Sequence, residues 1–130
     1  MLSIAPIPAF DDNYIWALHE GSAAVLVDPG DAAPCIEFLA QRGLSLVSIL
    51  ATHHHGDHVG GIAELAARYH PRVYGPAQES IPAITDPVAD GDTVTIAELG
   101  LQFRVIGTPG HTLGHVCYYG SGRLFFCWSR

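Results

Sequence analysis

The chain has 130 residues, 48% of them apolar and only 15% charged, a composition that excludes an intrinsically disordered protein and predicts one packed domain. Six arginines and no lysine stand against thirteen acidic residues, and the net charge of −7 argues against nucleic acid and anionic membranes as partners. No apolar run approaches the roughly 20 residues of a membrane span, and the N-terminal stretch, broken by Pro6 and Pro8, lacks the basic start of a signal peptide.

The three cysteines are Cys35, Cys117 and Cys127. They are odd in number and none stands in a Cys-x-x-Cys pair, so neither a disulfide framework nor a zinc ribbon is indicated. We therefore expect reduced thiols and a cytoplasmic location.

The first half of the chain predicts strands that alternate with helices. In residues 13–19 the large side chains of Tyr14, Trp16 and Leu18 alternate with Ile15, Ala17 and His19, which predicts a strand. Residues 23–27 form a continuous apolar run of the kind found in strands covered on both faces. A turn and helix cap at residues 28–31 lead into a helix that Gly43 closes.

A second strand and helix follow. Residues 46–51 predict a buried strand, and apolar residues at positions 62, 65, 66 and 69 predict one face of a helix that ends near His70-Pro71. We therefore predict an α/β fold, with strands between residues 13 and 28 and at 46–51 packed beneath helices near 32–42 and 58–69.

The second half predicts mainly strands. Residues 72–74 resemble a short strand, whereas prolines at 76, 82 and 87 indicate loops. Residues 94–96 and 101–106 predict paired strands with a turn at Gly100, and residues 115–119 and 123–127 predict two more. No internal repeat or linker is visible.

The turn between the second predicted strand and helix has the sequence Thr-His-His-His-Gly-Asp-His, residues 52–58. Alternate residues of an extended turn point the same way, so His53, His55 and Asp57 share a side, His54 faces away and His58 lies at the start of the helix. An expression tag would be terminal, and Asp57 alone could be a helix N-cap. The whole spacing favours a metal site over both readings.

His111 lies in another loop that leaves a strand end, within the Gly-Thr-Pro-Gly-His-Thr stretch of residues 107–112. With His53 and His55 it would give one zinc three histidine ligands and leave a fourth position for water, as in catalytic sites. His115 is better explained as a buried histidine that is bonded within the sheet or supports a ligand.

At this point the chain resembles a known family. Residues 52–58 match the metal signature of the metallo-β-lactamase superfamily. Three further stretches are similar to the glyoxalase II family of hydroxyacylglutathione hydrolases: residues 11–16 (Asp-Asp-Asn-Tyr-Ile-Trp), 27–32 (Val-Asp-Pro-Gly-Asp-Ala) and 108–112 (Thr-Pro-Gly-His-Thr). The resemblance covers about residues 2–127.

The resemblance implies the N-terminal portion of a metallo-β-lactamase-like αββα sandwich, with residues 1–130 as a single, incomplete domain. It implies that His53, His55 and His111 hold one metal, and that Asp57 and His58 serve a second. The metal would be zinc, with iron or manganese as alternatives.

The same resemblance implies a mechanism. A hydroxide held between the metals, with Asp57 as the catalytic carboxylate, would attack the thioester carbonyl of S-lactoylglutathione. The products would be lactate and glutathione, as in methylglyoxal detoxification. Asp28 would support the site without binding metal.

The chain departs from the family after residue 127. There the family continues Gly-Asp-Thr-Leu-Phe, whose aspartate bridges both metals, whereas this chain has Trp128-Ser129-Arg130. The second metal site is therefore incomplete, and we expect low activity or none. A frameshift or a truncated gene model would explain the abrupt change.

Two other functions are compatible with the sequence. One is another metallo-β-lactamase-fold hydrolase or an iron persulfide dioxygenase, which uses a similar His-x-His-x-Asp-His loop. The other is a non-catalytic metal-binding remnant, which the missing aspartate favours. The sequence gives neither the oligomeric state nor the exact acyl group.

Overall fold

The computed structural model describes residues 2–9, 13–53, 60–77, 81–107, 116–120 and 125–126. Its elements in chain order are β1 (Ser3–Ala9), β2 (Asn13–Glu20), β3 (Ala23–Val27), α1 (Ala32–Arg42), β4 (Ser45–Leu50), α3 (Ile62–Tyr69), β5 (Arg72–Pro76), β6 (Asp86–Val88), β7 (Thr93–Ile96), the 3-10 helix η1 (Ala97–Leu99), β8 (Leu101–Gly107), β9 (Val116–Gly120) and β10 (Phe125–Phe126).

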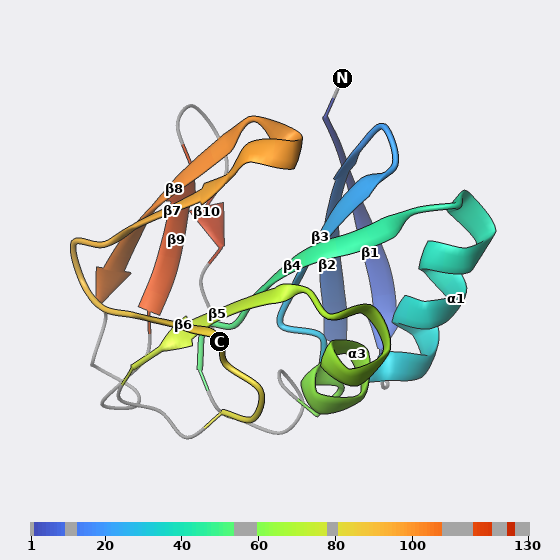
Figure 1. Cartoon of the computed structure of the whole chain (residues 1–130), viewed down its shortest axis with the longest axis horizontal. Helices are drawn as coiled ribbons and strands as arrows, with labels where there is room; N and C mark the ends of the chain where they lie inside the picture. Colours follow the sequence, from blue (N-terminus) through green and yellow to red (C-terminus); the bar gives the residue numbers. More distant parts are fainter. Residues whose placement is uncertain are drawn as a thin grey trace.

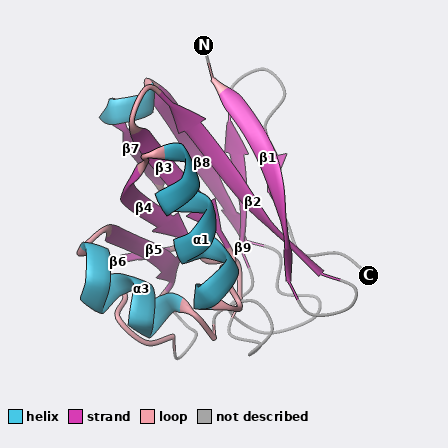
Figure 2. Cartoon of the chain, turned by 90° about the vertical axis from the view of Figure 1, so that its right-hand side faces the viewer, coloured by secondary structure: helices cyan, strands magenta, loops and turns pink. Residues whose placement is uncertain are grey.

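These elements form two sheets and a helical layer. The first sheet has the order β1-β2-β3-β4-β5-β6, antiparallel from β1 to β3 and parallel from β3 to β6, and the second has the antiparallel order β10-β9-β8-β7. Helices α1 and α3 lie together on one side of the first sheet, and the second sheet lies on its other side (Figures 1 and 2). The predicted α/β fold is confirmed. None of the described helices is long and apolar enough to cross a membrane.

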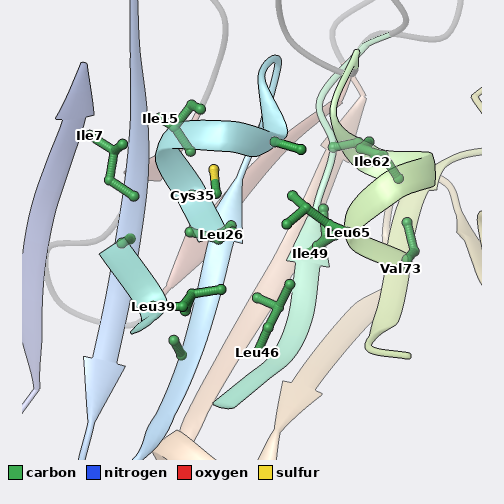
Figure 3. Close-up of a cluster of buried hydrophobic side chains, with 14 of the residues drawn as sticks. Ile7, Ile15, Leu26, Cys35, Leu39, Leu46, Ile49, Ile62, Leu65 and Val73 are labelled. Atoms are coloured by element: carbon green, nitrogen blue, oxygen red, sulfur yellow. The ribbon is translucent and has the colours of Figure 1, made fainter. Parts of the chain in front are cut away.

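The first core lies between the helices and the first sheet. Strand residues Ile15, Leu26 and Ile49 pack against Leu39 of α1 and Leu65 of α3, and all five are at most 1% exposed (Figure 3). Burial of each such side chain contributes about 1.5–3 kcal/mol. The predicted helix spacing is confirmed by the residues that face this core.

The second core lies between the two sheets. Leu18, Val25 and Leu50 from the first sheet pack with Phe103 and Tyr118 from the second. Successive residues of β3 therefore enter opposite cores, because strand side chains alternate between faces. This explains why residues 23–27 are apolar without interruption.

Both ends of α1 and the C-terminal end of α3 agree with the sequence prediction, whereas α3 begins at Ile62 and not near residue 58. Asp31 caps α1 by accepting a hydrogen bond from the Ala33 N–H at 3.3 Å, and Gly43 ends it with a φ of 63°. Helix α3 ends at Tyr69, and His70 adopts a left-handed φ of 54° before Pro71.

The prolines were misread. Strand β1, which contains Pro6 and Pro8, was not among the predicted strands, and Pro76 and Pro87 lie in β5 and β6 rather than in loops. Strand β1 is an edge strand, and residues two apart direct their N–H groups to the same side. Both missing N–H groups of β1 can thus face the open edge, where no hydrogen bond is lost.

The cysteines differ from one another in the structure. Cys35 is a free thiol in the first core, and burial, followed by the charge of Asp31, raises its pKa to about 12. Cys117 on β9 is disulfide-bonded, so the expectation of reduced thiols is wrong for that residue.

Candidate metal centre

The candidate centre begins where two neighbouring parallel strands end. Asp28 directly follows β3, and Thr52 and His53 follow β4. Parallel neighbours bring their carboxyl ends to the same edge of a sheet, which is where ligands of α/β proteins usually bind. Thr52 is 1% exposed and His53 is fully buried. The structure therefore places the first predicted ligand inside the molecule, at this edge.

The other predicted site residues are His55, Asp57, His58, His111 and His115, and they lie outside the described residues. Within the part of the chain that the structure describes, no group of three His, Cys, Asp or Glu side chains is placed to hold a metal. Their convergence on His53 stays a prediction.

Three hydrogen bonds connect Asp28, Thr52 and His53. The Thr52 N–H donates to Asp28 Oδ1 at 2.8 Å, and the Thr52 hydroxyl donates to Oδ2 at 2.7 Å. Thr52 Oγ1 also lies 2.8 Å from His53 Nδ1. The Asp28 carboxylate, at the end of β3, thus holds Thr52 at the end of β4. Thr52 directly precedes the predicted ligand His53.

The backbone at Asp28 is strained. Its φ is +51°, in the left-handed region, and its own N–H donates to the Leu50 carbonyl at 2.9 Å. Such a conformation costs about 1–3 kcal/mol in a residue other than glycine and is retained where the surroundings require it. The strain turns the buried carboxylate toward Thr52. The sequence suggested Asp28 as a supporting residue but not Thr52, whose only signal was its place before the first histidine.

The second sheet holds the same strand end from the other side. The Tyr118 hydroxyl donates to the carbonyl oxygen of Ala51 at 2.7 Å, and the carbonyl oxygen of Tyr74 lies 3.3 Å from the same hydroxyl. Burial, followed by the charge of Asp28, raises the pKa of Tyr118 well above its usual value, so the hydroxyl keeps its proton and stays a donor. Tyr118 was not among the predicted site residues, because nothing local in the sequence marks a tyrosine whose hydroxyl reaches from one sheet to the other.

The segment that carries His111 and His115 is anchored beside Thr52. Gly107, at the end of β8, pairs with Val116, at the start of β9. The Val116 N–H donates to the Thr52 carbonyl at 3.0 Å. The chain thus leaves the second sheet at residue 107 and returns at residue 116 next to the predicted ligand loop, which supports the pairing of His111 with His53.

The start of α3 packs tightly on the turn that follows Asp28. The Gly61 N–H donates to the Pro29 carbonyl at 2.9 Å. A Cβ at position 61 would lie 2.6 Å from Ala32 N and 2.8 Å from Pro29 O, and backbone atoms cannot move aside cheaply. Gly61 therefore fixes the distance between the helix after residues 52–58 and the Asp28 turn.

Gly61→Ala is expected to lower the free energy of unfolding by about 1–3 kcal/mol, the usual range for overpacking. The φ of Gly61 is −94°, so the effect comes from space and not from backbone conformation. Denaturant unfolding measures it. Gly75→Ala is the matched control, since the nearest atom to its Cβ would be the movable Ile84 Cδ1, at 2.8 Å, and all its near contacts are side-chain atoms. Equal losses in the two variants would contradict the tight contact.

Comparisons with known proteins agree with this geometry. The sequence model of the metallo-beta-lactamase superfamily matches residues 9–127. A hydroxyacylglutathione hydrolase from Cupriavidus metallidurans is 52% identical over 139 residues, covering 98% of this chain and 52% of that protein. One from Photobacterium profundum is 53% identical over 127 residues, covering 96% and 50%. The chain thus spans about half the length of the curated relatives it matches.

Two solved structures have the same fold. ETHE1 from Myxococcus xanthus superposes with a TM-score of 0.75 at 26% identity, over 91% of this chain and 53% of that one. The B3 metallo-beta-lactamase BLEG-1 gives a TM-score of 0.75 at 24% identity, over 92% and 66%. The likeness to BLEG-1 concerns the fold alone.

Proposed function

The chain belongs to the metallo-beta-lactamase superfamily, and from that premise we propose that it is part of a metal-dependent thioester hydrolase of the glyoxalase II type. The reaction would convert S-lactoylglutathione to lactate and glutathione, a step of methylglyoxal detoxification. The observation that carries the proposal is the identity of about half of the residues, along nearly the whole chain, with proteins named hydroxyacylglutathione hydrolase.

Zinc is the proposed metal, with iron or manganese as alternatives. His53, His55 and His111 would hold the first ion, and Asp57 and His58 would contribute to a second. Imidazole nitrogen and carboxylate oxygen are ligands that zinc accepts. His53 fits this role because it is buried and one ring nitrogen already has a hydrogen-bonding partner, as in most metal-bound histidines.

When bound, zinc would polarise the thioester carbonyl and lower the pKa of a coordinated water to about 7. Asp57 would orient the attacking water. The leaving thiolate, with a pKa near that of cysteine, about 8.5, requires no strong general acid. The hydrogen bonds of Asp28, Thr52 and Tyr118 would keep the first ligand in place.

Asp28 is proposed as a supporting residue, because its strained backbone and buried carboxylate serve Thr52 and not solvent. His115 is proposed for the same kind of role, which rests on its place four residues after His111.

The proposed partner is a small glutathione thioester, and the net charge of −7 argues against nucleic acid and anionic membranes. A cytoplasmic location is proposed because the reduced glutathione pool is found there. Residues 1–130 are proposed to belong to a single metallo-β-lactamase-like domain.

A substrate panel tests the proposed function. The chain, extended after Cys127 with the remaining half of the Cupriavidus metallidurans relative, is given S-lactoylglutathione, a β-lactam, and glutathione persulfide with oxygen. Thioester cleavage that a chelator stops is the expected result. Turnover of only the β-lactam or only the persulfide would favour the corresponding alternative, and no turnover would favour a non-catalytic metal-binding protein.

A further inference from the structure

The hydroxyl of Thr52 stands between a carboxylate and an imidazole. It lies 2.7 Å from Asp28 Oδ2 and 2.8 Å from His53 Nδ1. A threonine hydroxyl has one proton to give, and an ionised carboxylate can only accept. The proton of Thr52 therefore goes to Asp28, and the oxygen of Thr52 is left to accept from the histidine.

This order of donors selects one tautomer of His53. If the ring proton were on Nε2, Nδ1 would be an acceptor facing Thr52 Oγ1. Thr52 would then have to donate to the ring, and two acceptor oxygens, Oγ1 and Asp28 Oδ2, would face each other at 2.7 Å. With the proton on Nδ1, both short contacts are hydrogen bonds, and the lone pair of the ring is on Nε2.

We infer that Thr52 is a positioning residue, which fixes His53 as the Nδ1–H tautomer and so makes Nε2 the nitrogen that binds the metal. The inference rests on the proposed metal-dependent function. Asp28 orients Thr52 through two hydrogen bonds. Its Oδ1 accepts from the Thr52 N–H at 2.8 Å, and its Oδ2 accepts from the Thr52 hydroxyl at 2.7 Å.

Solvent has little access to these bonds. Thr52 is 1% exposed and His53 is 0% exposed, so bulk water does not compete for Nδ1. The β-branched side chain of threonine also has few rotamers, which keeps its hydroxyl between its two partners. Loss of the hydroxyl is thus expected to move the ring proton away from Nδ1, and not merely to replace the Thr52 oxygen by water as the acceptor of the ring N–H.

The first measurement is the ring tautomer of His53 in the metal-free chain, from two-bond proton–nitrogen NMR correlations at pH about 8, where imidazole is neutral. The wild type and Thr52→Ser are expected to give the Nδ1–H pattern. Thr52→Val, which keeps the shape without the hydroxyl, is expected to lose it. An Nε2–H pattern in the wild type would overturn the inference, and this measurement needs no variant to fold.

The second measurement is the zinc dissociation constant, by competition with a chelator. Thr52→Val is expected to bind zinc about 10–100-fold more weakly, the usual effect of removing a partner of a ligand, while Thr52→Ser stays near the wild type. Thr85→Val is the matched control, because the Thr85 hydroxyl also donates to a carboxylate, that of Asp86, but lies far along the chain from the ligand loop. Unchanged affinity in folded Thr52→Val would overturn the role of Thr52.

The two measurements separate this inference from the proposed function. If the wild-type chain binds no zinc, the proposed function fails and the role of Thr52 toward a metal falls with it. If the wild type binds zinc with an Nε2–H tautomer, only the role of Thr52 is overturned.

Discussion

Residues 1–130 alone, supplied with zinc, are expected to hydrolyse S-lactoylglutathione at least about 100-fold more slowly than the extended chain that carries the second half of the Cupriavidus metallidurans relative, because poor placement of the reacting groups costs that much. In the family pattern an aspartate after residue 127 bridges both metals, and here Trp128 follows instead. The second ion would keep only Asp57 and His58. Lost electrostatic stabilisation is expected to slow the reaction by a similar factor.

The measurement is the loss of thioester absorbance with both proteins at equal concentration. His55→Ala in the extended chain is the control, and it should remove the activity that a chelator also removes. Comparable turnover by residues 1–130 and by the extended chain would contradict the prediction.

Light scattering should be measured on the same samples as these rates, to detect association of the proteins. Strands β1 and β2 expose Ile4 (44%), Tyr14 (54%) and Trp16 (40%). Tyr14 and Trp16 are paired with prolines of β1 on the same face of the sheet, and their rings lie 6.3 Å apart. Contiguous exposed apolar surface favours association, so the rates must be compared at concentrations where both proteins are monomeric.

His111→Ala is expected to weaken zinc binding by roughly 100–1,000-fold. Structural zinc sites with four ligands contribute about 10–16 kcal/mol, so one ligand corresponds to roughly 2.5–4 kcal/mol, or two to three powers of ten in affinity. The physical reason to assign this role to His111 is that both ends of its segment, at Gly107 and Val116, are fixed beside Thr52. Competition with a chelator measures the affinity.

His54→Ala is the matched control for His111→Ala. It removes a histidine from the same cluster, but one that is predicted to face away from His53 and His55. Its zinc affinity should stay close to that of the wild type. Equal affinities of His111→Ala and wild type would rule out His111 as a ligand, whereas an equal loss in His54→Ala would mean that the facing pattern of residues 53–57 is wrong.

The sequence by itself determined the α/β fold, the superfamily and the helices. Patterns of period two and of period 3.6 are local, and they located β2, β3, β4, α1 and α3 because side-chain burial follows the same periods. The resemblance to the metallo-β-lactamase superfamily and to hydroxyacylglutathione hydrolases is confirmed by the comparisons. Motifs carry this information because the ligand residues must be particular chemical groups at fixed spacing.

The predictions from sequence were wrong where a residue's role depends on whether its strand lies at the edge of a sheet, or on which residue lies next to it in space. Prolines in β1, β5 and β6 indicated breaks because a proline in a central strand loses a hydrogen bond. Only the sheet order shows that β1 and β6 lie at the edges of the first sheet, and Pro76 is the last residue of β5. Cys117 was predicted to be a reduced thiol, whereas it is disulfide-bonded, and the number and spacing of the cysteines do not show which thiols lie close together.

Only the tertiary structure decided what holds the first ligand. Asp28 and Thr52 are separated by 24 positions, and Tyr118 and Ala51 by 67, yet each pair is joined by a short hydrogen bond. No local pattern predicts such pairs, because they arise from the parallel register of β3 with β4 and from the packing of one sheet on the other. The sequence predicted His53 as a metal ligand. The packing of the strands around His53 determined which of its ring nitrogens faces Thr52.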